Sequence, residues 1–257
     1  MPAGITPYGA GAHLSQGMSI NPLSLSPFIY LNSLLGLSLV DGAAVSTWPD
    51  QSGNGHNGTQ GVAGQKPTYR STGTHISVNG SPLVAFDGLD APNGDNIGGT
   101  LVPSNPSVAS GYDVLAYGRF YPAVNALNGS VFWQDDSGGR PQVGYQDATG
   151  QRWFMRDSIG TFTGSAFGTS NVYGSMRWRF TPITATTGTC DAYINGSAVL
   201  SHSYNFNPAL SGGWGLGANQ VDNVAALMDL GAFCWFTTVL TNRQANGIFR
   251  FWRAQFG

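Results

Sequence analysis

The chain of 257 residues is long enough for one large all-β domain with a buried core. Only 9% of its residues are charged, glutamate is absent, lysine occurs once, and the formal net charge is −2. This composition excludes the basic surface that phosphate neutralisation requires, so we expect no nucleic-acid partner. The most apolar run, residues 28–40, is shorter than the roughly 20 residues of a membrane span, so we expect no membrane partner either.

Residues 1–27 predict an extended arm ahead of the domain, because they are rich in Gly, Pro, Ala and Ser and show little periodicity. The first sixteen residues lack the basic region and apolar core of a secretory signal. An arm of this composition normally frays unless something holds it. We therefore expect the arm to contact another chain, with a neighbouring subunit as the first candidate.

The stretch WPDQSGNGHNGTQ, residues 48–60, concentrates polar side chains and three glycines in a short segment. Asp50 and the residues after it offer side-chain oxygens to backbone N–H groups, and the glycines permit positive φ. The pattern favours a shaped loop, anchored by Trp48, that closes an edge of a sandwich, over an active site. We expect His56 and Asn57 to face outward, where they would contact a ligand.

From residue 28 onward the sequence predicts short strands separated by turns. Within residues 176–180, Met, Trp and Phe alternate with Arg177 and Arg179, which places the apolar side chains on one face. These arginines, with Arg250 and Arg253, interleave with aromatics and are interpreted as pairing and stacking groups. Without βαβ alternation or internal repeats, the pattern favours an all-β, two-sheet antiparallel sandwich. The predicted strands are 83–86, 112–120, 130–134, 142–145, 152–156, 176–182, 190–194, 198–204, 214–217 and 227–236.

Asn-Gly occurs at 57–58, 79–80, 128–129 and 195–196, each time followed by Ser or Thr. Each site is formally an N-glycosylation sequon, and Asn-Gly is also the strongest signal for a two-residue hairpin turn. We interpret the four sites as turns and keep glycosylation as the alternative. The clearest case is 195–196, because apolar residues flank it on both sides.

Residues 241–257 predict a C-terminal helix. Thr241 and Gln244 fit a capping box, in which two side chains satisfy reciprocal backbone N–H groups. The apolar residues that follow recur at helical spacing, which predicts one stripe packed on the sandwich. They are Ala245, Ile248, Phe249, Trp252 and Phe256.

The two cysteines, Cys190 and Cys234, are interpreted as buried thiols. A disulfide is the alternative and would need their Cα atoms within about 7 Å. No Cys/His cluster has the spacing of a zinc site.

Several of these motifs occur in the order typical of one superfamily. They are WPDQSGNG (48–55), QKPTY (65–69), PLVAFDG (82–88) with Asp90, AYING (192–196), and LT (240–241) ahead of the terminal helix. In this order the chain resembles the concanavalin A-like, laminin-G-like jelly-roll domains of the lectin/glucanase superfamily, of the kind found in phage and bacterial surface proteins. The resemblance covers residues 28–257. It implies two curved antiparallel sheets, glycans bound on the concave face or at the loop rim, and calcium at the rim in some members.

A glycan site needs aromatic side chains that stack on sugar faces, with Asp, Asn or Arg beside them. Such residues cluster over three consecutive strand–turn units, and a core role for the aromatics is the alternative. The predicted ligand-binding residues of this cluster are Trp133, Asp135, Asp136, Arg140, Tyr145 and Trp153.

A second polar cluster contains Asp87, Asp90 and Asp95. Its carboxylates are ligands of the kind that Ca²⁺ takes in proteins, so calcium is the one cofactor considered. Asx-turns that bond their own backbone are the alternative interpretation.

Catalysis is not expected. Sugar hydrolysis requires two carboxyl groups facing one bond, and the chain lacks glutamate. The adjacent Asp135 and Asp136 would point to opposite faces of a strand. The four histidines show no nucleophile elbow nearby.

The sequence therefore predicts a non-enzymatic structural protein of a bacteriophage virion, with a lectin-like domain for cell-surface glycans. It would be a capsid decoration, fibre or tail component. The arm at 1–27 would contact other virion proteins or join subunits of a homo-oligomer. The alternatives are a secreted, extracellular bacterial carbohydrate-binding module and, less favoured, an aspartate-based glycoside hydrolase.

Overall fold

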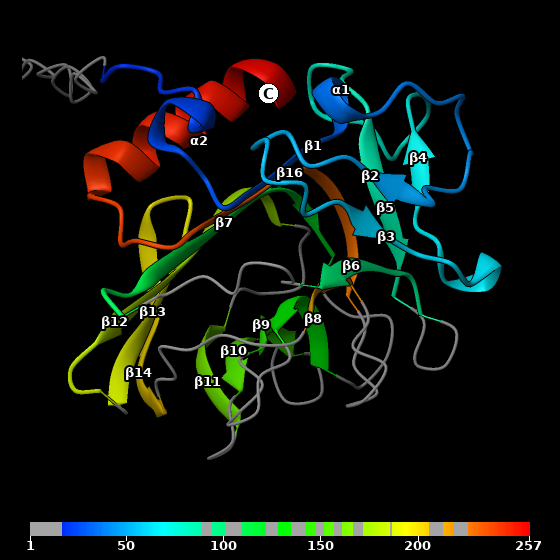
Figure 1. The fold of residues 1–257 in the computed structure, drawn as a ribbon. Helices are drawn as coiled ribbons and strands as arrows, with labels where there is room; N and C mark the ends of the chain where they lie inside the picture. Colours follow the sequence, from blue (N-terminus) through cyan, green and yellow to red (C-terminus); the bar gives the residue numbers. More distant parts are fainter. Residues whose placement is uncertain are drawn as a thin grey trace, which may run out of the picture.

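The computed structural model describes residues 17–88, 94–100, 109–121, 128–134, 142–146, 152–156, 161–166, 172–185, 187–205, 213–217 and 226–257. These residues form two antiparallel sheets packed face to face, with a C-terminal helix on the outer face of one sheet (Figure 1). The predicted all-β sandwich with a C-terminal helix is confirmed. None of the helices in the described residues has the length and apolarity that crossing a bilayer requires.

The first sheet has eight strands. Its members are β1 (Ile29–Asn32), β4 (Thr68–Arg70), β5 (Leu83–Asp87), β7 (Tyr112–Phe120), β12 (Val172–Pro182), β13 (Thr187–Ile194), β14 (Ser197–Asn205) and β16 (Leu227–Phe236). The order is β14-β13-β12-β7-β16-β5-β4. β16 pairs with β5 along its first half and with β1 along its second half, so it bridges the N-terminal and C-terminal parts of the chain.

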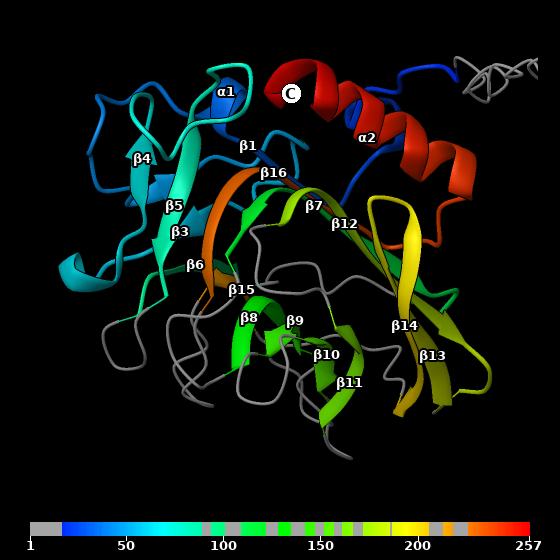
Figure 2. The ribbon, with the colours of Figure 1, turned by 180° about the vertical axis from the view of Figure 1, so that it is seen from behind.

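The second sheet packs against the concave side of the first, as the opposite views of Figures 1 and 2 show. Its strands are β2 (Thr47–Trp48), β3 (Gly58–Thr59), β6 (Asn96–Thr100), β8 (Asn128–Gln134), β9 (Gln142–Gln146), β10 (Arg152–Arg156), β11 (Thr161–Ala166) and β15 (Gly213–Gly217). The order is β11-β10-β9-β8-β15-β6-β3-β2. The helical segments are η1 (Pro22–Leu25), α1 (Ser33–Gly36), η2 (Ala63–Gln65) and α2 (Asn242–Phe256).

The main core lies between the sheets and follows the predicted alternation. Met176, Trp178 and Phe180 on β12 are fully buried in it, and the arginines between them point to the outer face. Across the core, the rings of Trp214 and Phe233 stack with centroids 6.0 Å apart. Each large apolar side chain buried in this way contributes roughly 1.5–3 kcal/mol.

A second core lies between the outer face of the first sheet and α2. The helix begins at Thr241 with the predicted capping box, and four of the five residues of its predicted stripe are fully buried. The exception is Phe249, which is only half-buried. The stripe packs on side chains that β1, β7 and β16 turn outward, such as Tyr30, Tyr117 and Cys234.

The two cysteines are free and buried, as predicted. Cys190 belongs to the core between the sheets, whereas Cys234 lies in the core beneath α2. Because they point to opposite faces of one sheet, a disulfide between them is excluded. Burial raises the pKa of the Cys234 thiol well above its usual value.

The described part of the arm, residues 17–27, packs on α2 of the same chain. The Ile20 N–H donates to the Gly247 carbonyl at 3.0 Å, and the Ile20 side chain occupies the space that a Cβ on Gly247 would fill. Asn21 caps η1, and Pro22 is buried. Residues 1–16 lie outside the described residues, so the predicted contact with another chain stays a prediction.

Two of the four Asn-Gly sites form turns. Asn195 and Gly196 have φ of 49° and 84° and connect β13 to β14, as predicted, and Gly80 also has positive φ in a turn. The turn prediction is wrong for Asn128-Gly129, which begins β8, and for Asn57-Gly58, where Gly58 begins β3. At these two sites strand pairing with β9, β2 and β6 overrides the local preference.

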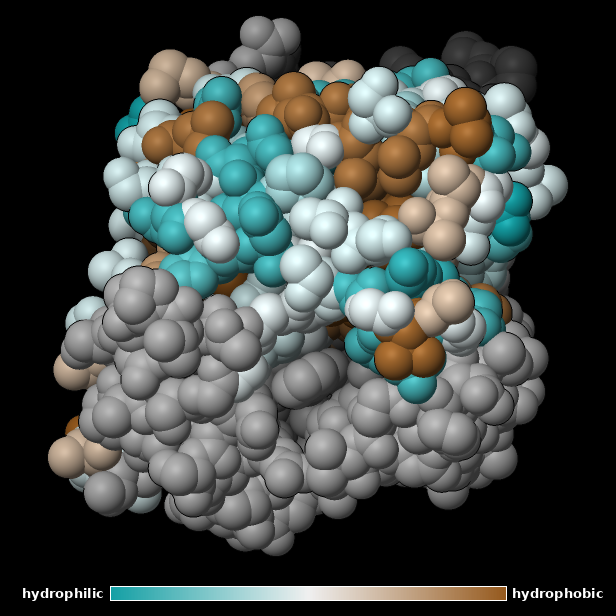
Figure 3. All heavy atoms as spheres, turned by 45° about the vertical axis from the view of Figure 1, so that its right-hand side comes forward, coloured by the Kyte–Doolittle hydropathy of each residue, from teal (hydrophilic) through white to brown (hydrophobic). Residues whose placement is uncertain are grey.

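Figure 3 shows one face of the molecule, with the α1 side brought forward. Apolar side chains gather mainly in the upper part of this face, with polar ones beside and below them. Exposed apolar residues near α1 include Leu35, Leu39 and Val40. Exposed apolar residues are normal for a protein surface.

Candidate functional site

The predicted glycan cluster falls largely outside the described residues. Asp135, Asp136 and Arg140 lie outside them, and so do the side chains of Trp133, Tyr145 and Trp153. The described backbone does make β8, β9 and β10 neighbours, and Tyr145 and Trp153 are direct cross-strand partners. This cluster therefore stays a prediction.

The loop of residues 48–60 is organised around one carboxylate. Asp50 Oδ1 accepts from the N–H groups of Tyr30 and Ser52, both at 2.9 Å, and Asp50 Oδ2 accepts from the N–H of His56 at 3.0 Å. The loop also contains Gly53 and Gly55 at φ of 88° and 79°. Asp50 thus fastens β1 to the loop, and its geometry agrees with the predicted structural role.

The expectation that His56 faces outward is wrong. Its side chain is buried, and its ring lies 4.3 Å from the Phe28 ring, centroid to centroid. The bond from the His56 N–H to Asp50 turns this residue inward. Asn57 is exposed, and its Oδ1 accepts from the Asp50 N–H at 2.8 Å. This bond helps to fix the conformation of the loop.

The predicted calcium cluster is brought together in part. Asp87 at the end of β5 and Asp95 ahead of β6 accept each other's backbone N–H, both at 3.1 Å. Burial, and next the charge of Asp87, raise the pKa of Asp95 to about 7. Asp90 lies outside the described residues, which contain no group of three or more His, Cys, Asp or Glu placed to hold a metal. Two carboxylates supply only part of the six to eight oxygens that Ca²⁺ takes, so calcium stays a prediction.

A groove that the sequence did not reveal lies on the outer face of the first sheet. It runs between α2 and the turn of the β13–β14 hairpin and consists of a cavity of about 270 Å³ and a smaller one of about 70 Å³. The two cavities share Gly196, Asn246 and Phe249 in their lining, so we treat them as one groove.

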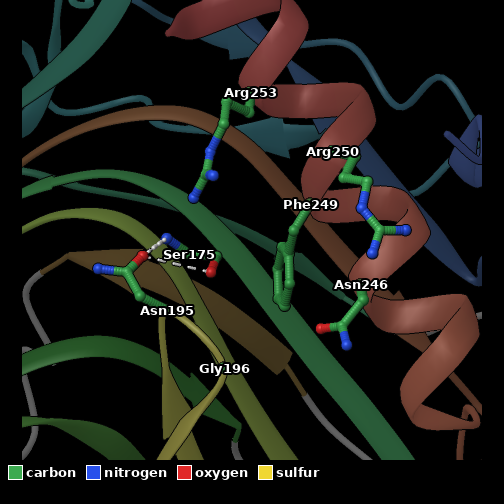
Figure 4. Close-up of a pocket in the computed structure, with 7 residues that line it drawn as sticks. All are labelled: Ser175, Asn195, Gly196, Asn246, Phe249, Arg250 and Arg253. Atoms are coloured by element: carbon green, nitrogen blue, oxygen red, sulfur yellow. Dashed lines mark hydrogen bonds between the residues drawn. The ribbon is translucent and has the colours of Figure 1, made fainter. Parts of the chain in front are cut away.

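The helical wall of the groove is one side of α2. The helical lining residues are Asn246, Phe249, Arg250 and Arg253, which follow each other at spacings of three, one and three residues. These spacings place them on neighbouring positions of the helix surface. Figure 4 shows the Arg253 side chain directed from α2 toward the opposite wall.

The opposite wall is the hairpin turn and the strand beneath it. The Asn195 N–H donates to the Ser175 carbonyl and the Ser175 N–H donates to Asn195 Oδ1, both at 2.9 Å. These reciprocal bonds fix the turn against β12. The positive φ of Asn195 and Gly196 is what lets the chain reverse at this point.

Arg177, which lines the smaller cavity, belongs to a buried ion pair with Asp113. Arg177 donates from Nε and Nη2 to the two oxygens of Asp113, both at 2.7 Å, and both side chains are buried. Asp113 also accepts the Leu240 N–H at 2.6 Å, and Arg177 donates to the Leu240 carbonyl. The charge of Arg177 is therefore balanced, and the segment that leads into α2 is held to the sheet.

Arg177 and the neighbouring Arg179 lie against an aromatic ring, Tyr193, which lines the smaller cavity together with Arg177. Arg177 and Arg179 lie with their guanidinium carbons 5.8 and 5.6 Å from the centre of the Tyr193 ring. Both arginines also donate to Asn242 Oδ1, at 3.0 and 2.6 Å. The predicted stacking role of both arginines is confirmed, and the predicted pairing role is confirmed for Arg177, which binds Asp113.

The groove is positively charged. Its lining contains arginines and no acidic residue, and Asp113 beneath it is committed to Arg177. Within the described residues, Arg179, Arg250 and Arg253 have no carboxylate at ion-pair distance. The sequence contained part of the signal, since Arg250 and Arg253 lie within the predicted helix among its aromatic residues, but only the packing of α2 on the sheet brings them to the hairpin.

Comparison with known proteins identifies the fold. No family model and no curated protein sequence matches the chain. Domain 4 of AbnA, a GH43 extracellular arabinanase from Geobacillus stearothermophilus, solved with arabinotriose, is similar over 87% of this chain and 98% of its own length, with a TM-score of 0.57 and 14% identity. The binding domain of Paraclostridial Mosquitocidal Protein 1 is similar over 89% of this chain and 52% of the other, with a TM-score of 0.54 and 17% identity.

A third similar structure is an enzyme. Trypanosoma rangeli sialidase with 2,3-difluorosialic acid matches over 95% of this chain, with a TM-score of 0.56 and 9% identity, but the chain covers only 37% of that protein. At these identities the likeness shows the fold alone. The chain spans about half of the mosquitocidal binding domain and about a third of the sialidase.

Proposed function

We propose that this protein is a non-catalytic carbohydrate-binding module of the concanavalin A-like, laminin-G-like type. The observation that carries the proposal is the likeness to Domain 4 of the arabinanase, because it spans 98% of a separate domain that was solved with an oligosaccharide. The second neighbour is itself described as a binding domain. The match to Domain 4 concerns a whole domain of about the size seen here, which is what a self-standing module requires.

The absence of glutamate supports a binding role over hydrolysis. Glycosidases place two carboxyl groups about 5–10 Å apart across an accessible bond. The coupled carboxylates that the structure describes, Asp87 and Asp95, instead hold each other's backbone N–H groups, and Asp95 is buried. Hydrolases among the similar structures make hydrolysis the alternative to test.

The test is a glycan microarray probed with the full chain. The affinity for arabinotriose and for each oligosaccharide that binds on the array is then measured by calorimetry. Reducing-sugar release is measured on the same mixtures. Saturable binding without release supports the proposal. Release that disappears in Asp136→Asn would establish the hydrolase instead, and an array without any bound glycan would refute the module.

Residence on a bacteriophage particle stays a prediction from the sequence. Imaging of purified virions with an antibody against this chain tests it, and an unlabelled particle contradicts it. A carbohydrate-binding module can serve on a virion or as a secreted protein, so this result is independent of the binding assay.

A further inference from the structure

We propose that the groove between α2 and the β13–β14 hairpin binds an acidic saccharide, one that carries carboxylate or sulfate groups. This inference rests on the proposed carbohydrate-binding function and names the ligand class and the place. The groove lies on the outer face of the first sheet, between one side of α2 and the hairpin turn (Figure 4), and not on the face that packs on the second sheet.

The charge of the groove is the first argument. Arg250 and Arg253 come from consecutive turns of α2, are exposed, and have no carboxylate partner in the described part of the chain. Arginines that share one cavity without counter-charge repel each other, and a bound anion removes that repulsion. The planar guanidinium also matches a carboxylate or sulfate with two parallel hydrogen bonds.

The hydrogen-bonding character of the groove is the second argument. Of the three side-chain amides in the lining, two already use their oxygens as acceptors: Asn195 Oδ1 accepts from Ser175, and Asn242 Oδ1 accepts from Arg177 and Arg179. Asn246 is the third. The guanidinium groups only donate. A ligand rich in acceptors therefore fits this lining better than a neutral sugar, whose hydroxyl groups must also donate.

The aromatic residues and the volume favour a saccharide over a free anion. Phe249 is half-buried in the lining of both cavities, and Tyr193 lines the smaller one, so the groove offers apolar faces beside its cations. Aromatic rings of this kind pack on the C–H faces of sugars. A volume of about 270 Å³ is far larger than one anion needs, and it is close to the roughly 300 Å³ at which small-molecule sites begin.

Two other occupants fit the groove less well. Residues 1–16 of the same chain contain no acidic residue, so they offer nothing to neutralise these arginines. Nucleic acid would require a broad basic surface, whereas the chain has a net charge of −2.

The experiment compares two double variants of the full chain. Arg250→Gln/Arg253→Gln removes the two helical cations of the groove. Lys66→Gln/Arg243→Gln removes the same charge from residues that line neither cavity. Binding of tri-galacturonic acid, a sulfated trisaccharide, neutral galactotriose, arabinotriose and inorganic sulfate is measured by calorimetry at low and high salt. Circular dichroism checks that both variants keep the fold.

We expect an acidic trisaccharide to bind the unchanged protein and the control variant equally, and the groove variant at least tenfold more weakly. A hydrogen bond to a charged group contributes about 1.5–3 kcal/mol of binding free energy, so the loss of one such bond already weakens binding about tenfold or more. We also expect the affinity to fall with added salt.

Each other outcome overturns the inference. Equal weakening in both variants would place the site elsewhere, and sulfate as strong as the saccharides would make the groove a simple anion site. Binding of neutral oligosaccharides alone would refute the acidic ligand while leaving the proposed function intact. A protein that binds none of the saccharides here or on the array would refute both.

Discussion

At the scale of single residues, the buried ion pair between Asp113 and Arg177 is the interaction whose loss should destabilise the fold most. Both side chains are buried, and the pair also satisfies the backbone of Leu240 ahead of α2. Removing one partner leaves the other charge buried without compensation, which costs about 3–5 kcal/mol.

We therefore expect Asp113→Ala to lower the free energy of unfolding by about 3–5 kcal/mol in urea titrations. Asp191→Ala is the matched control, because Asp191 lies on the neighbouring part of the same sheet but is half-exposed. We expect a change within about 0.5 kcal/mol for it. Similar unfolding midpoints for the two variants would show that the buried pair is not needed for stability.

Asp95 gives a prediction about pH. Its folded-state pKa is raised to about 7, above its ordinary value of 3.8, by burial and by Asp87. The folded state therefore binds the proton more tightly, so this contribution to stability is complete below pH 3.8 and is lost as the pH rises toward 7. We expect Asp95→Asn to melt close to the unchanged protein at pH 4 and above it at pH 8.

The control for this titration is Asp41, whose pKa is lowered mainly by the bond from the Ser71 N–H. For Asp41 the sign is opposite: its contribution is present above the ordinary pKa and is lost as the pH falls. Asp41→Asn should therefore lose melting temperature relative to the unchanged protein as the pH rises. A pH-independent difference for Asp95→Asn would contradict the coupling of the two carboxylates.

At the scale of elements, the contact between the arm and α2 depends on one glycine. Alanine at a helix interior normally stabilises by about 1 kcal/mol relative to glycine. At Gly247, however, an added Cβ would lie 2.6 Å from two side-chain carbons of Ile20. Steric exclusion of Ile20 should outweigh the gain in helix propensity.

We expect Gly247→Ala to detach residues 17–27 from the helix, seen as faster proteolytic cleavage within this segment. The double variant Gly247→Ala/Ile20→Ala separates the clash from a general effect on the helix. It should be cleaved no faster than Ile20→Ala alone. If Gly247→Ala leaves the cleavage rate unchanged, the arm is held by contacts other than this one.

The sequence predicted strands and helices correctly where a local pattern of apolar and polar residues was long enough to distinguish a strand from a helix or a loop. β7, β10 and β16 have the predicted bounds, and the capping box at Thr241 starts α2 as predicted. The strands that were missed are β1, β2, β3, β4, β6 and β11. Several have only two to four residues, or carry glycines as β6 does, so no alternation marks them, and pairing with distant strands alone makes them extended.

At the scale of the whole molecule, the described part of the arm belongs to the sandwich. Its Ile20 and Leu25 side chains pack against the core that α2 forms with the first sheet, and the Ile20 N–H donates to the Gly247 carbonyl of the helix. A chain that lacks residues 1–27 should therefore melt at a lower temperature than one that lacks residues 1–16, as measured by calorimetry. Equal melting temperatures for the two truncations would show that residues 17–27 add nothing to the stability of the domain.

The sequence by itself determined the layers of this protein. Period-two alternation in β12, the Asn195-Gly196 turn and the stripe of α2 are local patterns, each decided by residues a few positions apart. The absence of glutamate also follows from the sequence alone, and it weighed against hydrolysis from the start.

Only the tertiary structure decided which polar side chains are buried and which lie close together. His56 turns inward because Asp50 holds its backbone, although its neighbours in sequence are those of an exposed loop. The groove exists because α2 crosses the outer face of the sheet and brings Arg250 and Arg253 to Ser175 and Asn195. Such a site depends on packing between segments that are more than fifty residues apart in the sequence. A pattern within a few neighbouring residues cannot show that two such segments meet in the folded protein.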